Sequence, residues 1–263
     1  TSTTPLIVPL TFKGTATDGS DYTKVVNVTI PANTASVQVP IKTLTDGLLE
    51  GDETVIVTVG TPTGAPANTP VFLGAGDDGT GTIKDNTKLT VAISDTPVVN
   101  EGVGLEYTVT LTGGTSPNPI IVPVTYTGTA ADGSDYTKTV NVTIPANATT
   151  ATLTVPTKID TVLEGDETVT VTLQPGTDYS VSTTQGNTTG TIKDLTQLTV
   201  QIDDAPDQPE GSDLVYIVRL VGGTSDTPIT VPLTYGGTGT PVLDYSGNPI
   251  SVIIPAGQTS TTV

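Results

Sequence analysis

Apolar and polar residues alternate in short runs along the whole chain, and no stretch shows a sustained apolar period of 3.6 residues. In one clear run, Leu105, Tyr107, Val109 and Leu111 alternate with polar residues. A period of two residues is typical of strands that have one buried and one solvated face. Strands are therefore predicted around residues 89–93, 105–111, 122–126, 140–144, 151–155, 169–173 and 191–194.

The same pattern occurs more than once. The segment Thr115–Thr129 recurs as Thr1–Thr15 and, more loosely, as Thr224–Thr238, so the copies are offset by 114 and 109 residues. The acidic segment Asp160–Glu167 likewise recurs as Asp46–Glu53. A period near 110 residues is the length of a whole domain and is too long for a solenoid repeat.

These offsets divide the chain into three copies, which we name repeats 1, 2 and 3. Repeat 1 covers residues 1–85 and lacks the first two predicted strands, repeat 2 covers residues 86–194 and is complete, and repeat 3 covers residues 195–263 and lacks the C-terminal strands. About seven strands separated by Gly, Pro, Asn and Asp turns predict an immunoglobulin-like sandwich. The expected fold class is therefore all-β, with tandem sandwiches. The linkers, residues 84–88 and 193–197, are so short that neighbouring repeats are expected to abut at a restricted angle.

The amino-acid composition limits which ligands, reactions and partners the chain can have. The chain has no cysteine and no histidine, which excludes disulfides and the usual zinc, haem and iron–sulfur ligands, and leaves oxygen ligands that suit calcium. The absence of histidine also lowers the expectation of hydrolytic catalysis, and no enzymatic activity is predicted. The formal net charge of −18 makes nucleic acids and anionic membrane surfaces improbable partners. The apolar runs are of strand length, so no membrane insertion is expected.

The acidic residues of repeat 2 fall in turns that antiparallel connectivity brings to one end of the sandwich. These turns join predicted strands one and two, three and four, and five and six, and the last strand ends there too, beside the next repeat. Their acids are Glu101, Asp132, Asp135, Asp160, Glu164, Asp166 and Asp194. Carboxylates crowded together repel one another, and a divalent cation with six to eight oxygen ligands offsets that repulsion. A calcium site is therefore predicted at this pole. The alternative is that each loop is an ordinary solvated turn whose charges discourage edge pairing.

Three segments carry a family resemblance: Gly128–Tyr136, Val142–Ala146 and Asp160–Val169. Together they resemble a Calx-β domain. Their tandem, acidic and cysteine-free form is similar to the extender repeats of large RTX-type bacterial surface adhesins secreted by type I systems. The resemblance implies an immunoglobulin-like sandwich whose polar loops bind Ca2+ near the domain junction.

The resemblance extends to individual positions in all three repeats. The matching residues are Glu101, Asp135, Asp160, Glu164 and Asp194 in repeat 2, and Asp21, Asp46, Glu50 and Asp85 in repeat 1. Repeat 3 keeps Glu210 and Asp244 but has Pro241 in place of the Asp132 equivalent, so its site is expected to be incomplete.

The function predicted from these features is structural. Calcium-stiffened sandwiches, with neighbouring repeats as their partners, are expected to project an adhesive region from a bacterial cell in cell adhesion and biofilm formation, outside the cell. Two alternatives remain open: a module that binds a glycan or protein, and a subunit of a self-assembling extracellular filament or matrix. An aromatic-lined groove would favour glycan binding, and concentration-dependent growth would favour homotypic assembly.

Overall fold

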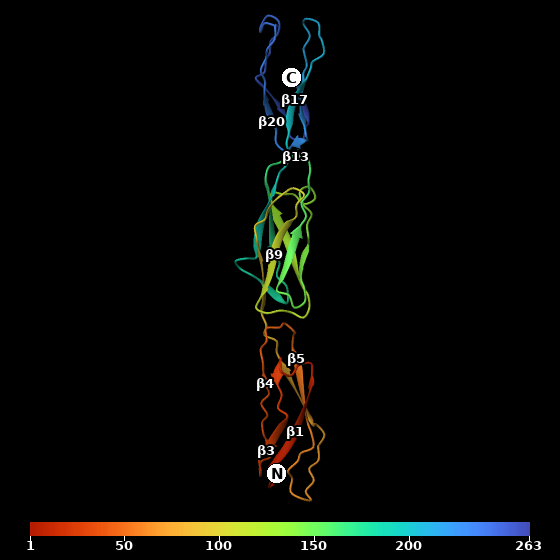
Figure 1. Ribbon diagram of the computed structural model, residues 1–263, viewed down its shortest axis with the longest axis vertical. Helices are drawn as coiled ribbons and strands as arrows, with labels where there is room; N and C mark the ends of the chain where they lie inside the picture. Colours follow the sequence, from red (N-terminus) through yellow and green to blue (C-terminus); the bar gives the residue numbers. More distant parts are fainter.

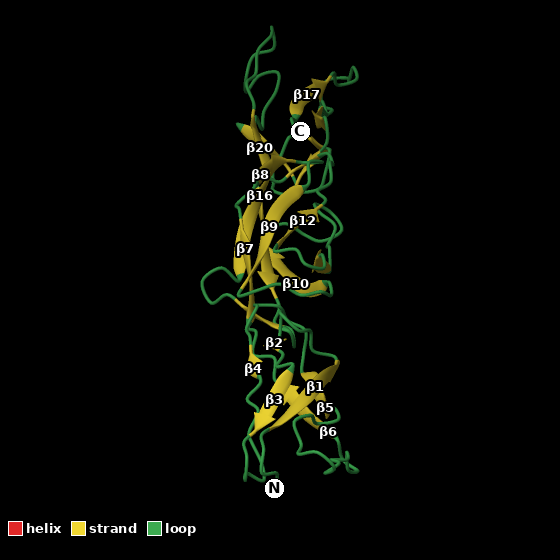
Figure 2. Cartoon of the chain, turned by 60° about the horizontal axis from the view of Figure 1, so that its bottom comes forward, coloured by secondary structure: helices red, strands yellow, loops and turns green.

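The computed structural model describes residues 1–263 and shows three repeats stacked end to end along one axis (Figure 1). Every regular element is a strand (Figure 2). No helix in the chain is long and apolar enough to cross a membrane.

Repeat 2 is a complete two-sheet sandwich. Its strands are β7 (Leu89–Ser94), β8 (Val98–Asn100), β9 (Leu105–Thr112), β10 (Ile120–Gly128), β11 (Asn141–Ile144), β12 (Thr150–Val155), β13 (Val162–Leu163), β14 (Glu167–Leu173), β15 (Tyr179–Val181) and β16 (Asn187–Lys193). One sheet has the order β11-β10-β14-β16-β8 and the other has the order β12-β9-β7-β15. The predicted fold class, tandem immunoglobulin-like sandwiches, is therefore confirmed.

The core of repeat 2 lies between these sheets and follows the alternation seen in the sequence. In β9, Leu105, Tyr107 and Val109 are all 0% exposed, whereas the residues between them face outward or are half-buried. The buried hydroxyl of Tyr107 donates a hydrogen bond to the carbonyl of Val169 in the opposite sheet. Burial raises the pKa of Tyr107 to about 12, so the ring remains neutral inside the core.

The short strands β8, β13 and β15 were not predicted. The first strand divides between the two sheets: β7 runs beside β15 in one sheet, and β8 runs parallel to β16 in the other. Asp95 lies between β7 and β8 with φ at 74°, a left-handed conformation that Asp tolerates better than most residues. Its carboxylate also accepts a hydrogen bond from the backbone N–H of Thr108. Asp95 therefore stabilises the turn in which the chain passes from one sheet to the other.

Repeats 1 and 3 contain parts of the same sandwich. Repeat 1 contains β1 (Leu6–Gly14), β2 (Tyr22–Thr23), β3 (Asn27–Ile30), β4 (Lys42–Thr43), β5 (Glu53–Val59) and β6 (Asp78–Ile83). Repeat 3 contains β17 (Thr199–Asp203), β18 (Ile217–Val221), β19 (Thr224–Ser225), β20 (Ile229–Pro232), β21 (Ser251–Ile254) and β22 (Ser260–Thr262). In repeat 1, the face of β1, β3 and β5 that corresponds to the core side of repeat 2 is an apolar groove, lined by Val8, Leu10, Val28, Ile30, Val57 and Val59 among others.

The stability of the repeat 2 sandwich should depend much more on its inward-facing residues than on its outward-facing ones. Ile144 is 0% exposed and Ile121 is 59% exposed, although both lie in the same pair of neighbouring strands. Replacement of Ile144 by Ala should lower the free energy of unfolding by about 2–5 kcal/mol, because it removes buried methyl groups and leaves a cavity. Ile121→Ala should change it by less than about 0.5 kcal/mol. Urea unfolding followed by circular dichroism measures both, and equal losses would contradict this assignment of the core.

Candidate metal centre

Three carboxylates of repeat 2 converge at the pole that faces repeat 3. Asp135, Glu164 and Glu167 each place an oxygen within 4.8 Å of the others. Asp135 comes from the turn between β10 and β11, Glu164 from the loop after β13, and Glu167 from the first position of β14. Residues distant in sequence therefore meet because alternate turns of an antiparallel sandwich share one end.

Asp135 is held in place by its own turn. Its Oδ2 accepts a hydrogen bond of 2.5 Å from the backbone N–H of Ala131, and its own N–H donates to the Ala131 carbonyl. The residue is only 7% exposed, and its Oδ1 is buried without any hydrogen-bond partner. A buried carboxylate oxygen without a partner is costly, so this atom points to a ligand such as a cation.

Glu101 adds a second buried oxygen without a partner at the same pole. It is 9% exposed, and its Oε2 has no hydrogen-bond partner. Burial raises the pKa of Glu101, and the negative charges of Asp160 and Asp194 raise it further. Those two charges are the ones that antiparallel connectivity predicts to lie near Glu101.

The carboxylate of Asp194, just after the end of β16, binds backbone N–H groups of the acidic loop and of the linker. One of its oxygens accepts hydrogen bonds of 2.8 and 2.9 Å from the N–H groups of Glu164 and Gly165, and the other accepts one from Thr196. Partial burial opposes ionisation, but these three bonds outweigh it and hold the pKa of Asp194 below its usual value. Asp194 therefore fixes the acidic loop to the linker in its charged form. Asp160 has a related local role, because its Oδ1 accepts from the N–H of Val162.

The cluster is electrostatically strained when no cation is present. Burial raises the pKa of Glu167 to about 7, and the negative charge of Asp135 raises it in the same direction. The pKa of Glu164 is also raised, first by burial and then by Asp135 and Asp160, with a further contribution from Asp226 of repeat 3. These carboxylates repel one another at short range, and neutralisation by protons or by a cation relieves that repulsion.

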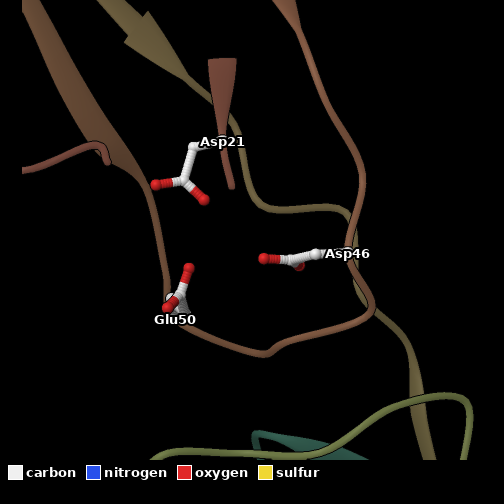
Figure 3. Close-up of side chains that lie close together, drawn as sticks. All are labelled: Asp21, Asp46 and Glu50. Atoms are coloured by element: carbon white, nitrogen blue, oxygen red, sulfur yellow. The ribbon is translucent and has the colours of Figure 1, made fainter. Parts of the chain in front are cut away.

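Repeat 1 contains a similar cluster, in which Asp46, the equivalent of Asp160, takes part and the equivalent of Glu167 does not. Asp21, Asp46 and Glu50 point toward one another, with oxygens within 4.8 Å (Figure 3). Burial and the charges of Asp21, Asp46 and Asp85 raise the pKa of Glu50. Asp85 makes the same contacts as Asp194: its Oδ2 accepts hydrogen bonds of 2.8 Å from the backbone N–H groups of Glu50 and Gly51.

Besides Asp85, Glu101, Asp160 and Asp194, which are described above, four more of the predicted site residues lie outside these clusters. Asp132 forms an ion pair with Lys138 at 3.4 Å, and Asp166 forms one with Lys193 at 4.0 Å, both on the surface. Glu210 and Asp244 of repeat 3 are exposed, and the Asp244 carboxylate accepts a bond from the N–H of Thr240. None of the four belongs to a group of three converging carboxylates.

Glu167 and its repeat 1 equivalent, Glu53, were not among the predicted ligands. The signal was present in the alternation of β14, where Glu167 is in phase with the buried residues Val169 and Val171. Its side chain therefore faces inward at the end of the core, whereas Asp166, one position earlier, faces outward. Glu53 stands in the same phase as Val55, and its pKa is raised by burial and by Asp21.

The donor set consists of carboxylate oxygens, several of them held by backbone hydrogen bonds. Such a set suits a hard divalent cation such as calcium, which takes six to eight oxygen ligands in flexible geometry. In repeat 2, Asp135, Glu164, Glu167 and Glu101 are the residues placed to supply ligands, with Asp160 and Asp194 beside them.

The raised pKa of Glu167 generates a prediction for the metal-free protein. Folding raises this pKa from 4.5 to about 7, so Glu167 favours the folded state below pH 4.5, and that contribution is lost as the pH rises through about 7. In chelator, the free energy of unfolding should therefore fall between about pH 5 and pH 8. Glu167→Gln should flatten this dependence, and Asp166→Asn should not. Urea titrations across this range test it, and a slope unaffected by Glu167→Gln would contradict the assignment.

Comparison with known proteins agrees with this architecture. The Calx-beta domain family matches residues 3–87 and 83–206. The crystal structure of the apo-form Calx CBD1 domain aligns with 21% identity and a TM-score of 0.36, over 41% of this chain and 97% of that one. The crystal structure of CBD12 from CALX1.2 aligns with 17% identity and a TM-score of 0.33, over 74% of this chain and 89% of that one.

A third crystal structure, of the calcium binding domain CBD12 of CALX1.1, aligns with 20% identity and a TM-score of 0.28, over 64% of this chain and 68% of that one. No curated protein sequence matches the chain. The family match covers most of the chain. The chain therefore belongs to the Calx-beta domain family.

Proposed function

We propose that this chain is a calcium-stiffened structural spacer, in which each cation site locks a sandwich to the one that follows. The observation that carries the proposal is the buried, unpartnered Oδ1 of Asp135 within the carboxylate cluster beside the junction. The donor set, made of carboxylate oxygens in a chain without histidine or cysteine, favours calcium as the cation.

The mechanism is electrostatic. Without a cation, the carboxylates of the pole repel one another, and the loop that carries Glu164 is held chiefly through Asp194 and the next repeat. A bound cation would draw the Asp135, Glu164 and Glu167 side chains toward one centre. Because the same loop contacts the linker and the next repeat, its immobilisation would restrict the joint.

The end-to-end stacking of the repeats suits a spacer (Figure 1). The setting that fits a tandem, acidic, cysteine-free array best is the surface of a bacterial cell, where such a segment would hold an adhesive region away from the envelope and support biofilm formation. Extracellular calcium sites typically have dissociation constants of about 10⁻⁴–10⁻³ M, so millimolar calcium would fill them.

Calcium should raise the melting temperature of the full chain. At a concentration 100 times the dissociation constant, a site adds about 2.7 kcal/mol to the free energy of unfolding. Calorimetric melts in chelator and in roughly 10 mM calcium chloride should therefore differ by several degrees. Asp135→Asn should remove the part of the shift that belongs to repeat 2, because it removes a buried ligand.

The matched control is Asp166→Asn, which makes the same chemical change in a carboxylate that lies outside the cluster and pairs with Lys193. This variant should retain the full calcium shift. If calcium left the melts of all three proteins unchanged, the carboxylates would only solvate the pole, and the spacer mechanism would be wrong.

A second candidate is self-assembly into a filament, in which the end-to-end stacking of the three repeats would continue between copies (Figure 1). The spacer proposal instead expects a monomer whose sedimentation coefficient does not change with protein concentration in calcium. Analytical ultracentrifugation distinguishes the two, because species that grow with concentration would favour the filament.

A further inference from the structure

The acidic loops of repeats 1 and 2 are each paired, backbone to backbone, with the repeat that follows. In the second junction, β13 lies parallel to β19 of repeat 3, with Val162 opposite Thr224 and Leu163 opposite Ser225. The N–H of Thr224 donates to the carbonyl of Thr161 at 2.9 Å, and the N–H of Asp226 donates to the carbonyl of Leu163 at 3.2 Å. These bonds join the loop that contains Asp160 and Glu164 directly to another repeat.

The first junction has the same arrangement. Leu48 bridges Thr115 in the parallel sense, the N–H of Thr115 donates to the carbonyl of Gly47 at 2.9 Å, and the N–H of Leu49 donates back to Thr115 at 2.8 Å. The side chain of Leu49 also packs against the hydrophobic core of repeat 2. Two junctions with equivalent bonds indicate a repeated docking mode.

A pair of glycines precedes the docked strand in both cases, Gly113–Gly114 and Gly222–Gly223. A Cβ on Gly114 would lie 2.0 Å from the carbonyl oxygen of Gly47, and a Cβ on Gly223 would lie 1.7 Å from that of Thr161. Real Cβ atoms do not approach backbone oxygens this closely, so any other residue would push the repeats apart. The second glycine of each pair is therefore fitted to the preceding repeat.

We infer that the segments Gly113–Thr115 and Gly222–Thr224 are docking surfaces for the acidic loop of the preceding repeat, so that each cation site is fully ordered only when the next repeat is docked. The inference rests on the proposed cation site and adds a dependence between repeats. Docking holds the backbone on which Glu164 stands, and it brings the negative charge of Asp226 toward that residue. By linkage, a docked neighbour raises the affinity for the cation, and the cation strengthens docking.

The test variant is Gly223→Ala in the full chain. The matched control is Gly257→Ala, which lies in the same repeat and also has a positive φ, 70°, but whose added Cβ meets nothing within 4 Å. Because the chain has no cysteine, spin labels can be placed at Thr152→Cys and Thr230→Cys, two exposed positions in repeats 2 and 3. All proteins carry Asp21→Asn, so that the calcium titration reports on repeat 2.

Gly223→Ala should broaden the distance distribution between the two labels and lower the calcium affinity by about fivefold or more, as measured by titration calorimetry with calcium chloride. Gly257→Ala should leave both quantities unchanged. The inference is overturned if either quantity in Gly223→Ala equals that of the control.

Two further outcomes are decisive. If the unsubstituted protein binds no calcium, the proposed function fails, and the docking surface is judged by the distances alone: broadening in Gly223→Ala supports it and an unchanged distribution overturns it. If Gly223→Ala does not fold, Gly114→Ala tests the first junction in the same way, with labels at the exposed positions Thr29 and Thr152 and with Asp135→Asn in place of Asp21→Asn.

Discussion

Repulsion among partly buried carboxylates is the constraint on which the junctions of this chain depend. Oxygens of Asp135, Glu164 and Glu167, from two segments distant in sequence, lie within 4.8 Å of one another, and two oxygens at this pole, on Asp135 and Glu101, have no partner. Such an arrangement opposes folding unless protons or a cation neutralise it. It persists because the sandwich behind it supplies an independent core, in which Tyr107 and its neighbours are fully buried.

Most of the fold could be predicted from the sequence because the strand period and the repeat are both local signals. The seven predicted runs of repeat 2 correspond to β7, β9, β10, β11, β12, β14 and β16. The strands β8, β13 and β15 were missed for a physical reason. They are two or three residues long, too short for alternation to be visible, and their pairings are parallel contacts with segments distant in sequence.

The candidate site was predictable to the level of the loop and less so to the level of the residue. Antiparallel connectivity places the turns at one pole, but it does not say which acid of Glu164–Glu167 turns inward. The alternation of β14 supplies this information, because Glu167 lies on the same face as Val169, whereas Asp166 points to Lys193. The fit of Gly223 against Thr161 could not be predicted, because it depends on a backbone in another repeat.

The two junctions also explain how an array of such repeats can act as one body. Each acidic loop is bonded on one side to the aspartate of its own linker, Asp85 or Asp194, and on the other to Thr115 or Thr224 of the next repeat. The loop therefore has few conformations left that do not also move the neighbouring repeat. In a linear array with only nearest-neighbour contacts, stability is approximately the sum of the contributions of the repeats and of their junctions. A charge change at one pole then acts on the adjacent joint, while the hydrophobic core of each sandwich remains as it was.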